Sequence, residues 1–274
     1  MTYRSFMLIL LPGLILFNSC RNKAKDSEEH FLKGNDYIFS DDFTNAKKEY
    51  ELAVKIDSGN WKACYSLAGV YEMEGDINNS LYYFNKTLSI NPNFALCYFN
   101  RSNLEDMLGE SRASSKDLNK TIELKKNFYL ALLTRAEKEY AANQLKEANM
   151  DFDAAILARS DFYLTYSLRG SVKLRMGDYD GAVKDFETEM SLSPGHMMSY
   201  ANRAICYASQ KKIRDALTDI NTAIGMDSTW SQNYLYRGSY LYNLNSKDSA
   251  CKDFNRALQM KNPEAVNYLK QYCQ

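Results

Sequence analysis

Small and large apolar side chains recur along the chain at an interval of 34 residues. With Ser27 as place 1, seven successive rows of 34 residues end at residue 264. Place 8 is small in every row: Gly34, Ala68, Ser102, Ala136, Gly170, Ala204 and Gly238. Place 20 is small as well: Ala46, Ser80, Ser114, Ala148, Ala182, Ala216 and Ala250. A register kept through seven rows predicts seven copies of one structural unit.

Two further places are large and apolar in every row. Place 24 holds Tyr50, Phe84, Leu118, Phe152, Phe186, Ile220 and Phe254. Place 28 holds Val54, Leu88, Ile122, Ile156, Met190, Ile224 and Leu258. Places 4, 7, 8 and 11 share one face of a first helix, and places 20, 24, 27 and 28 share one face of a second. Because turn signals such as Gly75 and Gly177 lie between them, each row predicts a helical hairpin.

A helical hairpin of 34 residues resembles the tetratricopeptide repeat. Row five carries the resemblance best, through Gly170, Gly177, Tyr179, Ala182, Phe186 and Pro194. The resemblance implies an all-α protein, a right-handed α-solenoid of seven hairpins. The repeats are expected at 27–60, 61–94, 95–128, 129–162, 163–196, 197–230 and 231–264. Residues 265–274 are expected to form a capping helix, since a solenoid needs one to cover its last apolar face.

Opposite charges occupy two of these places together. Place 7 is arginine and place 23 is aspartate in rows three to seven: Arg101 and Asp117, Arg135 and Asp151, Arg169 and Asp185, Arg203 and Asp219, Arg237 and Asp253. Row one has Lys33 and Glu49, whereas row two has the uncharged Leu67 and Tyr83. Because the two places change together, we expect structural ion pairs within each repeat. An anion-binding row of arginines is the alternative.

The first twenty residues have the pattern of an export signal. Arg4 is followed by the charge-free run Phe6–Phe17, which is shorter than the roughly 20 residues of a transmembrane helix. The end of the run resembles a bacterial lipoprotein signal, which implies a signal peptide at 1–19 and a lipidated Cys20, with 20–26 as a short linker. The alternative is an ordinary cleaved signal with a spare cysteine.

Composition and motifs provide no evidence for catalysis or cofactor binding. The 34 basic and 34 acidic residues give a net charge of zero, so nucleic acid is not an expected partner. The two histidines, His30 and His196, are far apart in the sequence, and no phosphate-binding glycine loop is present. Residues 178–187 partly resemble a calcium-binding loop. Ala182 and Phe186 are helix-packing residues, however, which favours a repeat turn followed by a helix. We therefore expect no enzyme activity, no metal site and no cofactor.

The remaining cysteines fall into two groups. Cys64, Cys97 and Cys206 lie within first helices, where buried thiols act as small apolar side chains. Cys251 and Cys273 lie near the end of the chain and could form a disulfide in an oxidising compartment. That bond would fasten the terminal helix, which is the part most prone to fray.

The resemblance also implies that a peptide or protein partner binds the concave face, which the first helices line. The candidate contacts on that face are Phe31, Asn35, Tyr65, Phe99, Asn103, Leu133 and Tyr140. Packing of these side chains against neighbouring helices is the alternative.

These features together predict a non-enzymatic, membrane-anchored adaptor in the bacterial cell envelope. We expect a lipid anchor in the outer membrane, with the membrane face undecided. Two other interpretations stay open. One is an accessory lipoprotein of a nutrient- or glycan-uptake system, and the other is a soluble cytoplasmic scaffold whose N-terminus only resembles a signal.

Overall fold

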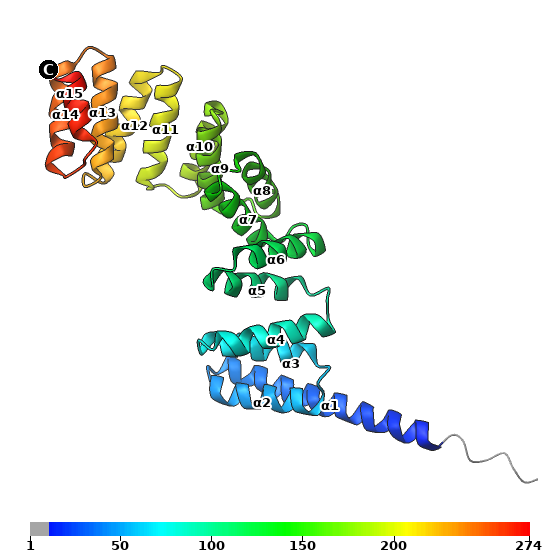
Figure 1. Cartoon of the computed structure of the whole chain (residues 1–274). Coiled ribbons are helices and arrows are strands. Elements are labelled where there is room, and N and C mark those ends of the chain that lie inside the picture. Colours follow the sequence, from blue (N-terminus) through cyan, green and yellow to red (C-terminus); the bar gives the residue numbers. More distant parts are fainter. Residues whose placement is uncertain (1–10) are drawn as a thin grey trace, which may run out of the picture. The chain divides into compact units, whose positions relative to one another are not determined.

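The structure, a computed structural model, describes residues 11–274 and the side chains of residues 22–274. The predicted signal peptide therefore lies mostly outside the described residues, and so does the Cys20 side chain. All elements of the described part are helices (Figure 1). They are α1 (Leu11–Phe39), α2 (Phe43–Ile56), α3 (Trp61–Met73), α4 (Ile77–Ile90), α5 (Ala95–Met107), α6 (Ser111–Leu124), α7 (Tyr129–Ala141), α8 (Leu145–Ala158), α9 (Tyr163–Met176), α10 (Tyr179–Leu192), α11 (Met197–Ser209), α12 (Ile213–Met226), α13 (Ser231–Asn243), α14 (Lys247–Gln259) and α15 (Ala265–Tyr272).

The helices form stacked hairpins in two compact units, which meet in the sequence at Lys126 and Asn127. In the N-terminal unit, α1 pairs with α2, α3 with α4 and α5 with α6. In the C-terminal unit, helices α7 to α14 form four hairpins in the same way, and α15 packs on α14. Within each unit, the second helix of one hairpin also packs on the first helix of the next. This is the all-α hairpin array that the period of 34 predicts.

The turn inside each hairpin depends on one backbone conformation. Place 15 has a positive φ in all seven rows: Asp41, Gly75, Gly109, Asn143, Gly177, Lys211 and Asn245. The second helix then begins after an N-cap residue. Asp42, Asp76 and Asp178 fill this role by accepting a hydrogen bond from the backbone N–H three residues later, which satisfies a free donor of the first turn.

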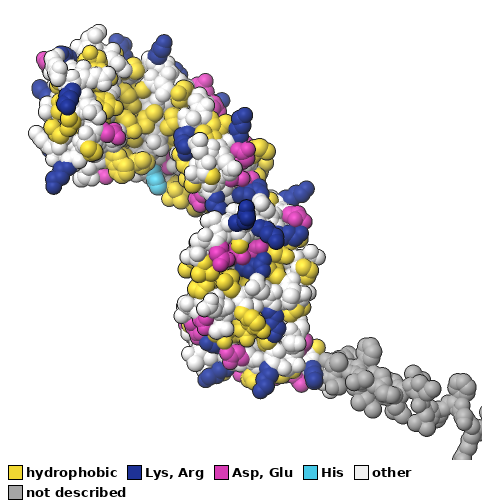
Figure 2. Space-filling view, in the orientation of Figure 1, with side chains coloured by type: hydrophobic (Ala, Val, Ile, Leu, Met, Phe, Trp, Pro, Cys, Tyr) yellow, Lys and Arg dark blue, Asp and Glu magenta, His cyan; other side chains and the backbone are white. Residues whose placement is uncertain are grey.

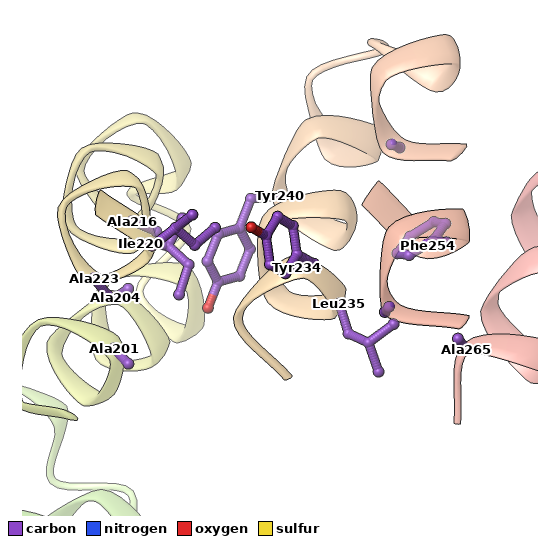
Figure 3. Close-up of a cluster of buried hydrophobic side chains, with 13 residues drawn as sticks. Ala201, Ala204, Ala216, Ile220, Ala223, Tyr234, Leu235, Tyr240, Phe254 and Ala265 are labelled. Carbon is purple, nitrogen blue, oxygen red and sulfur yellow. The ribbon is translucent and has the colours of Figure 1, made fainter. Parts of the chain in front are cut away.

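Small residues at place 8 let the two helices of a hairpin approach closely. A Cβ atom added to Gly34, Gly170 or Gly238 would lie closer than 3.0 Å to the aromatic ring at place 24 of the same row. From α11 to α15, the buried side chains form one cluster that continues to the last helix. Figure 3 shows Ile220 of α12, Tyr240 of α13 and Phe254 of α14 directed into this interior.

The arginine at place 7 makes a bidentate ion pair within its own hairpin. The pairs are Arg101 with Asp117, Arg135 with Asp151, Arg169 with Asp185, Arg203 with Asp219, and Arg237 with Asp253. Arginines of this set also contact place 25 of the preceding row, as Arg101 does with Asn85, Arg169 with Asp153, Arg203 with Glu187, and Arg237 with Asn221. The arginine therefore links the helices of one hairpin and also links that hairpin to the previous one.

Rows one and two use other contacts. In row one, the suggested pairing of Lys33 with Glu49 is wrong, because Lys33 pairs with Glu29 on its own helix and Glu49 bonds to His30. Across the first two rows, the Tyr71 hydroxyl donates to Glu51 at place 25. An aromatic hydroxyl thus supplies the link between hairpins that arginine supplies later in the chain.

The C-terminal end of the array follows the expected boundaries, whereas the N-terminal end does not. α15 occupies Ala265–Tyr272, within the range expected for the capping helix. At the other end, α1 begins at Leu11, so residues 20–26 are helical and continuous with the first repeat. No glycine or proline lies between Leu14 and Lys33 to end the helix, which explains why this segment is not the separate linker that we expected.

Candidate functional site

The candidate partner contacts on the first helices are largely engaged in packing. Phe99 is only 8% exposed, so it is not available to a ligand. Tyr65 packs on Phe84 and Phe94, with ring centroids 5.9 and 4.8 Å away, and its hydroxyl accepts a hydrogen bond from Asn100. The side chains at place 5 therefore point toward neighbouring helices more than toward solvent.

The other candidates are half-buried. Phe31 packs against Tyr50 with ring centroids 6.0 Å apart, and Asn35 accepts a 2.7 Å hydrogen bond from the Tyr50 hydroxyl. Leu133 packs on a buried cluster of the C-terminal unit. Tyr140 lies under the Arg175 guanidinium, 4.6 Å from the ring centroid. Asn103 is partly exposed. The structure therefore favours packing as the main role of this set.

Other apolar residues of the first helices point to solvent in a regular arrangement. In the N-terminal unit they lie at place 13: Phe39, Met73 and Met107, which are 89%, 60% and 73% exposed. In the C-terminal unit they lie at place 2: Leu130, Leu164 and Met198, which are 49%, 38% and 42% exposed. We call these sets the N-terminal and the C-terminal apolar columns.

The N-terminal column does not continue into the C-terminal unit. Place 13 in the C-terminal unit holds Ala141, Arg175, Ser209 and Asn243. Place 2 in the N-terminal unit begins with the charged Glu28 and Lys62, which form an ion pair, and becomes apolar only at Leu96. Both columns follow the same period of 34, so places 13 and 2 of successive rows indicate them in the sequence.

Several carboxyl groups near these surfaces have a raised pKa. Burial raises the pKa of Glu72, which neighbours Met73, and the pKa of Glu137 on α7. Burial, with the nearby charge of Asp117, raises the pKa of Glu105 to about 7. Glu139 occupies the same place in the next row, and its pKa is also raised to about 7, by burial and by Asp151.

One buried acid was missed by the sequence analysis. Glu189 lies at place 27, where the other rows hold alanine or threonine, and it is buried between hairpins. Its Oε1 atom is 3.8 Å from Nδ1 of His196, and its pKa is raised by burial. Comparing place 27 across the rows would have revealed it.

The cysteines with described side chains are either buried free thiols or joined in a disulfide. Cys64, Cys97 and Cys206 are buried, and burial raises the pKa of each thiol, which suppresses the reactive thiolate. Cys251 and Cys273 form a disulfide that joins α14 to the residue after α15. Among the described side chains, no cluster of three or more His, Cys, Asp or Glu could hold a metal ion.

With this geometry in view, the comparisons with known proteins identify the fold. The tetratricopeptide repeat model matches residues 30–60. A tetratricopeptide repeat protein from Parabacteroides merdae aligns with 91% of this chain and 100% of its own, with 21% identity and a TM-score of 0.57. The chain has the tetratricopeptide repeat fold.

Two further structures with this tetratricopeptide fold align well. The C-terminal part of a repeat protein from Cytophaga hutchinsonii has a TM-score of 0.67 and 12% identity, covering 86% of this chain and 98% of that one. YrrB, described as having an unusual peptide-binding site, has a TM-score of 0.61 and 17% identity, covering 69% of this chain and 97% of that one. No curated protein matches the sequence.

The tetratricopeptide helices are too short or too polar to be membrane spans. Across residues 11–274, none combines the length and the apolar character needed to cross a bilayer.

Proposed function

We propose that this tetratricopeptide chain is a non-enzymatic adaptor that binds a protein or peptide on its first helices. The observation that carries the proposal is the pair of apolar columns. Each exposes one large apolar side chain at the same place of three successive hairpins. Exposed apolar surface in a regular arrangement is typical of interaction sites.

The two columns give the two units different binding surfaces. A partner that covers the N-terminal column meets Phe39 and two flexible methionines, which adapt to partners of different shape. A partner on the C-terminal column meets Leu130 and Leu164, at the other end of the first helices. The peptide-binding site of the similar protein YrrB supports a peptide or protein ligand.

We further propose that the adaptor is anchored in the bacterial cell envelope through a lipidated Cys20. The lipoprotein-like end of the charge-free run supports this proposal. Two or more acyl chains are enough for stable membrane attachment. A membrane-anchored adaptor would hold its partner close to the bilayer.

Two triple variants test the binding proposal. One changes Phe39, Met73 and Met107 to Ser, and the other changes Leu130, Leu164 and Met198 to Ser. The matched control changes Tyr82, Met150 and Leu157 to Ser. These apolar residues lie on second helices, and they are about as exposed as the N-terminal column and more exposed than the C-terminal column. Partners are cross-linked in cells to the tagged chain and quantified by mass spectrometry, with melting temperatures measured in parallel.

We expect at least one first-helix variant to lose specific partners at an unchanged melting temperature. The control should keep them. Equal partner sets in all three variants, or an equal loss in the control, would contradict a binding site on the first helices.

A further inference from the structure

The second helix of row three carries a stripe of basic side chains. Arg112, Lys116 and Lys120 lie four residues apart on α6, at places 18, 22 and 26. They therefore share one face of the helix, spaced about 6 Å apart along its axis. Figure 2 shows dark blue side chains gathered at the level of α6.

No other second helix has a base at all three of these places. The corresponding residues are Thr44, Lys48 and Leu52 in α2, Asn78, Tyr82 and Lys86 in α4, Lys146, Met150 and Ala154 in α8, Asp180, Lys184 and Thr188 in α10, Arg214, Thr218 and Thr222 in α12, and Asp248, Lys252 and Arg256 in α14. The stripe is therefore a property of row three and not of the repeat.

The stripe borders two hollows in the surface of the N-terminal unit. One, of about 670 Å³, is lined by the whole stripe together with Tyr98 and Asn119. The other, of about 600 Å³, lies beside the first turn of α6 and shares Arg112 and Lys116 with the first. Because they share these two bases, the two hollows adjoin each other along α6.

Most of the positive charge in the stripe is available to a ligand. Arg112 and Lys116 are exposed and form no ion pair among residues 22–274. Lys120 bonds to Glu123 at 2.7 Å, but Glu123 is exposed and such a surface pair exchanges partners at little cost.

Three carboxylates also face the two hollows. Asp117 is already held by Arg101, so it does not compete for the stripe. Glu110 and Glu123 lie at opposite ends of α6. The lysines at 125 and 126 follow the helix and add positive charge beyond Glu123. Like charges four residues apart destabilise a helix, so the stripe lowers the stability of α6 unless an anion binds there.

We propose that this stripe binds an acidic segment of a protein partner in an extended conformation. Alternate side chains of an extended chain point the same way and lie about 6.6 Å apart, which nearly matches the spacing of the bases along α6. Asp or Glu at every second position would then meet Arg112, Lys116 and Lys120 in turn. The inference rests on the proposed adaptor function, but it places this contact on a second helix, whereas the apolar columns lie on first helices.

Peptide binding to the full chain in detergent tests this inference. The probes are fluorescein-labelled peptides (Glu-Ser)4, (Glu-Glu-Ser-Ser)2 and (Gln-Ser)4, which separate charge from spacing. Vesicles of phosphatidylglycerol, compared with phosphatidylcholine, test a lipid surface as the ligand instead. The variant changes Arg112, Lys116 and Lys120 to Gln. The control makes the same change of charge through Lys146→Gln, Lys184→Gln and Arg214→Gln, which are exposed bases of three other second helices.

We expect (Glu-Ser)4 to bind more tightly than (Glu-Glu-Ser-Ser)2, and (Gln-Ser)4 not to bind. The stripe variant should bind (Glu-Ser)4 at least ~10-fold more weakly, because it loses three charge contacts, whereas the control should change less than ~2-fold. Four results would overturn the inference: no binding of (Glu-Ser)4, equal binding of the two acidic peptides, equal loss in the control, or a preference for anionic vesicles. If the first-helix variants still lose partners, such a result removes this inference alone and leaves the proposed function intact.

Discussion

At the scale of single residues, place 15 shows how one backbone conformation limits the sequence. It has a positive φ in all seven rows, at which glycine pays no steric cost. Glycine occupies place 15 in three rows. Asp41, Asn143 and Asn245 tolerate the positive φ because their short polar side chains can form local hydrogen bonds. Lys211 adopts φ 63° without either advantage. It is therefore the least favourable residue found at this place.

Replacing Lys211 with Gly should stabilise the protein. The left-handed conformation costs a lysine about 1 kcal/mol or more, and the greater chain entropy of unfolded glycine offsets part of the gain. We expect the free energy of unfolding to rise by ~0.5–1 kcal/mol, measured by urea denaturation. Lys211→Ala serves as the control, because it keeps a Cβ at the strained position and should bring no gain. Equal stabilisation by both changes would argue against backbone strain.

Glu105 should make stability depend on pH. Its pKa is raised from 4.5 to about 7 in the folded protein, chiefly by burial. The protonated form suits the fold, so the contribution of Glu105 is most favourable below pH 4.5 and is lost as the pH rises through 7. Glu105→Gln stays neutral at every pH. It should therefore raise the free energy of unfolding by at least ~1 kcal/mol more at pH 8 than at pH 5. An equal effect at the two pH values would contradict the raised pKa.

At the scale of helices, the period of 34 was sufficient to predict the hairpins, because close helix packing requires small and large residues in fixed positions. The same period could not predict where α1 begins, since residues 14–33 contain no helix-breaking residue. It also could not separate ligand contacts from packing at place 5. Side chains such as Tyr65 lie on the first-helix face and still contact the neighbouring helices.

The pair of Arg237 and Asp253 tests what the repeated ion pairs contribute. Asp253 is buried, and two hydrogen bonds from Arg237 satisfy it. Arg237→Met should lower the free energy of unfolding by ~3 kcal/mol, because it leaves a buried charge without a partner. Adding Asp253→Leu should recover most of that loss. Row two supports this expectation, since it folds with uncharged residues at both places. A double variant no more stable than the single one would show that the pair itself stabilises the fold.

The disulfide should determine how firmly the last helix is held. Cys251 and Cys273 close a loop with a sequence separation of 22, for which the expected stabilisation is ~3 kcal/mol. Without the bond, α15 would still be held by Tyr268 and Tyr272, which pack on Phe254. Cys273→Ser should therefore increase hydrogen exchange in residues 265–272 while exchange in the N-terminal unit stays unchanged. A reducing agent should reproduce this in the wild type and have no further effect on the variant.

At the scale of the whole molecule, periodicity alone hides the division into units. The period of 34 continues unchanged through residues 124–129, although the compact units divide at Lys126. The place-13 column does end at this division, whereas exposed apolar side chains at place 2 begin one row earlier, at Leu96. Two distinct exposed apolar surfaces would suit the proposed adaptor better than a protein with a single small ligand.

Attachment to the membrane is the prediction that concerns the molecule as a whole, because it decides which partners the columns can meet. Cells are given an alkyne fatty-acid analogue, and the chain is examined for label and for its distribution between membrane and soluble fractions. We expect the wild type to be labelled and membrane-bound, and Cys20→Ala to be unlabelled. The matched control is Cys64→Ala, which removes a buried thiol of the first helices and should keep the label. Two acyl chains bind a bilayer stably, whereas a single chain binds only marginally and reversibly. A wild type that is unlabelled and soluble would exclude the anchor while leaving the binding surfaces as they are, so the membrane proposal stands or falls independently of the adaptor function.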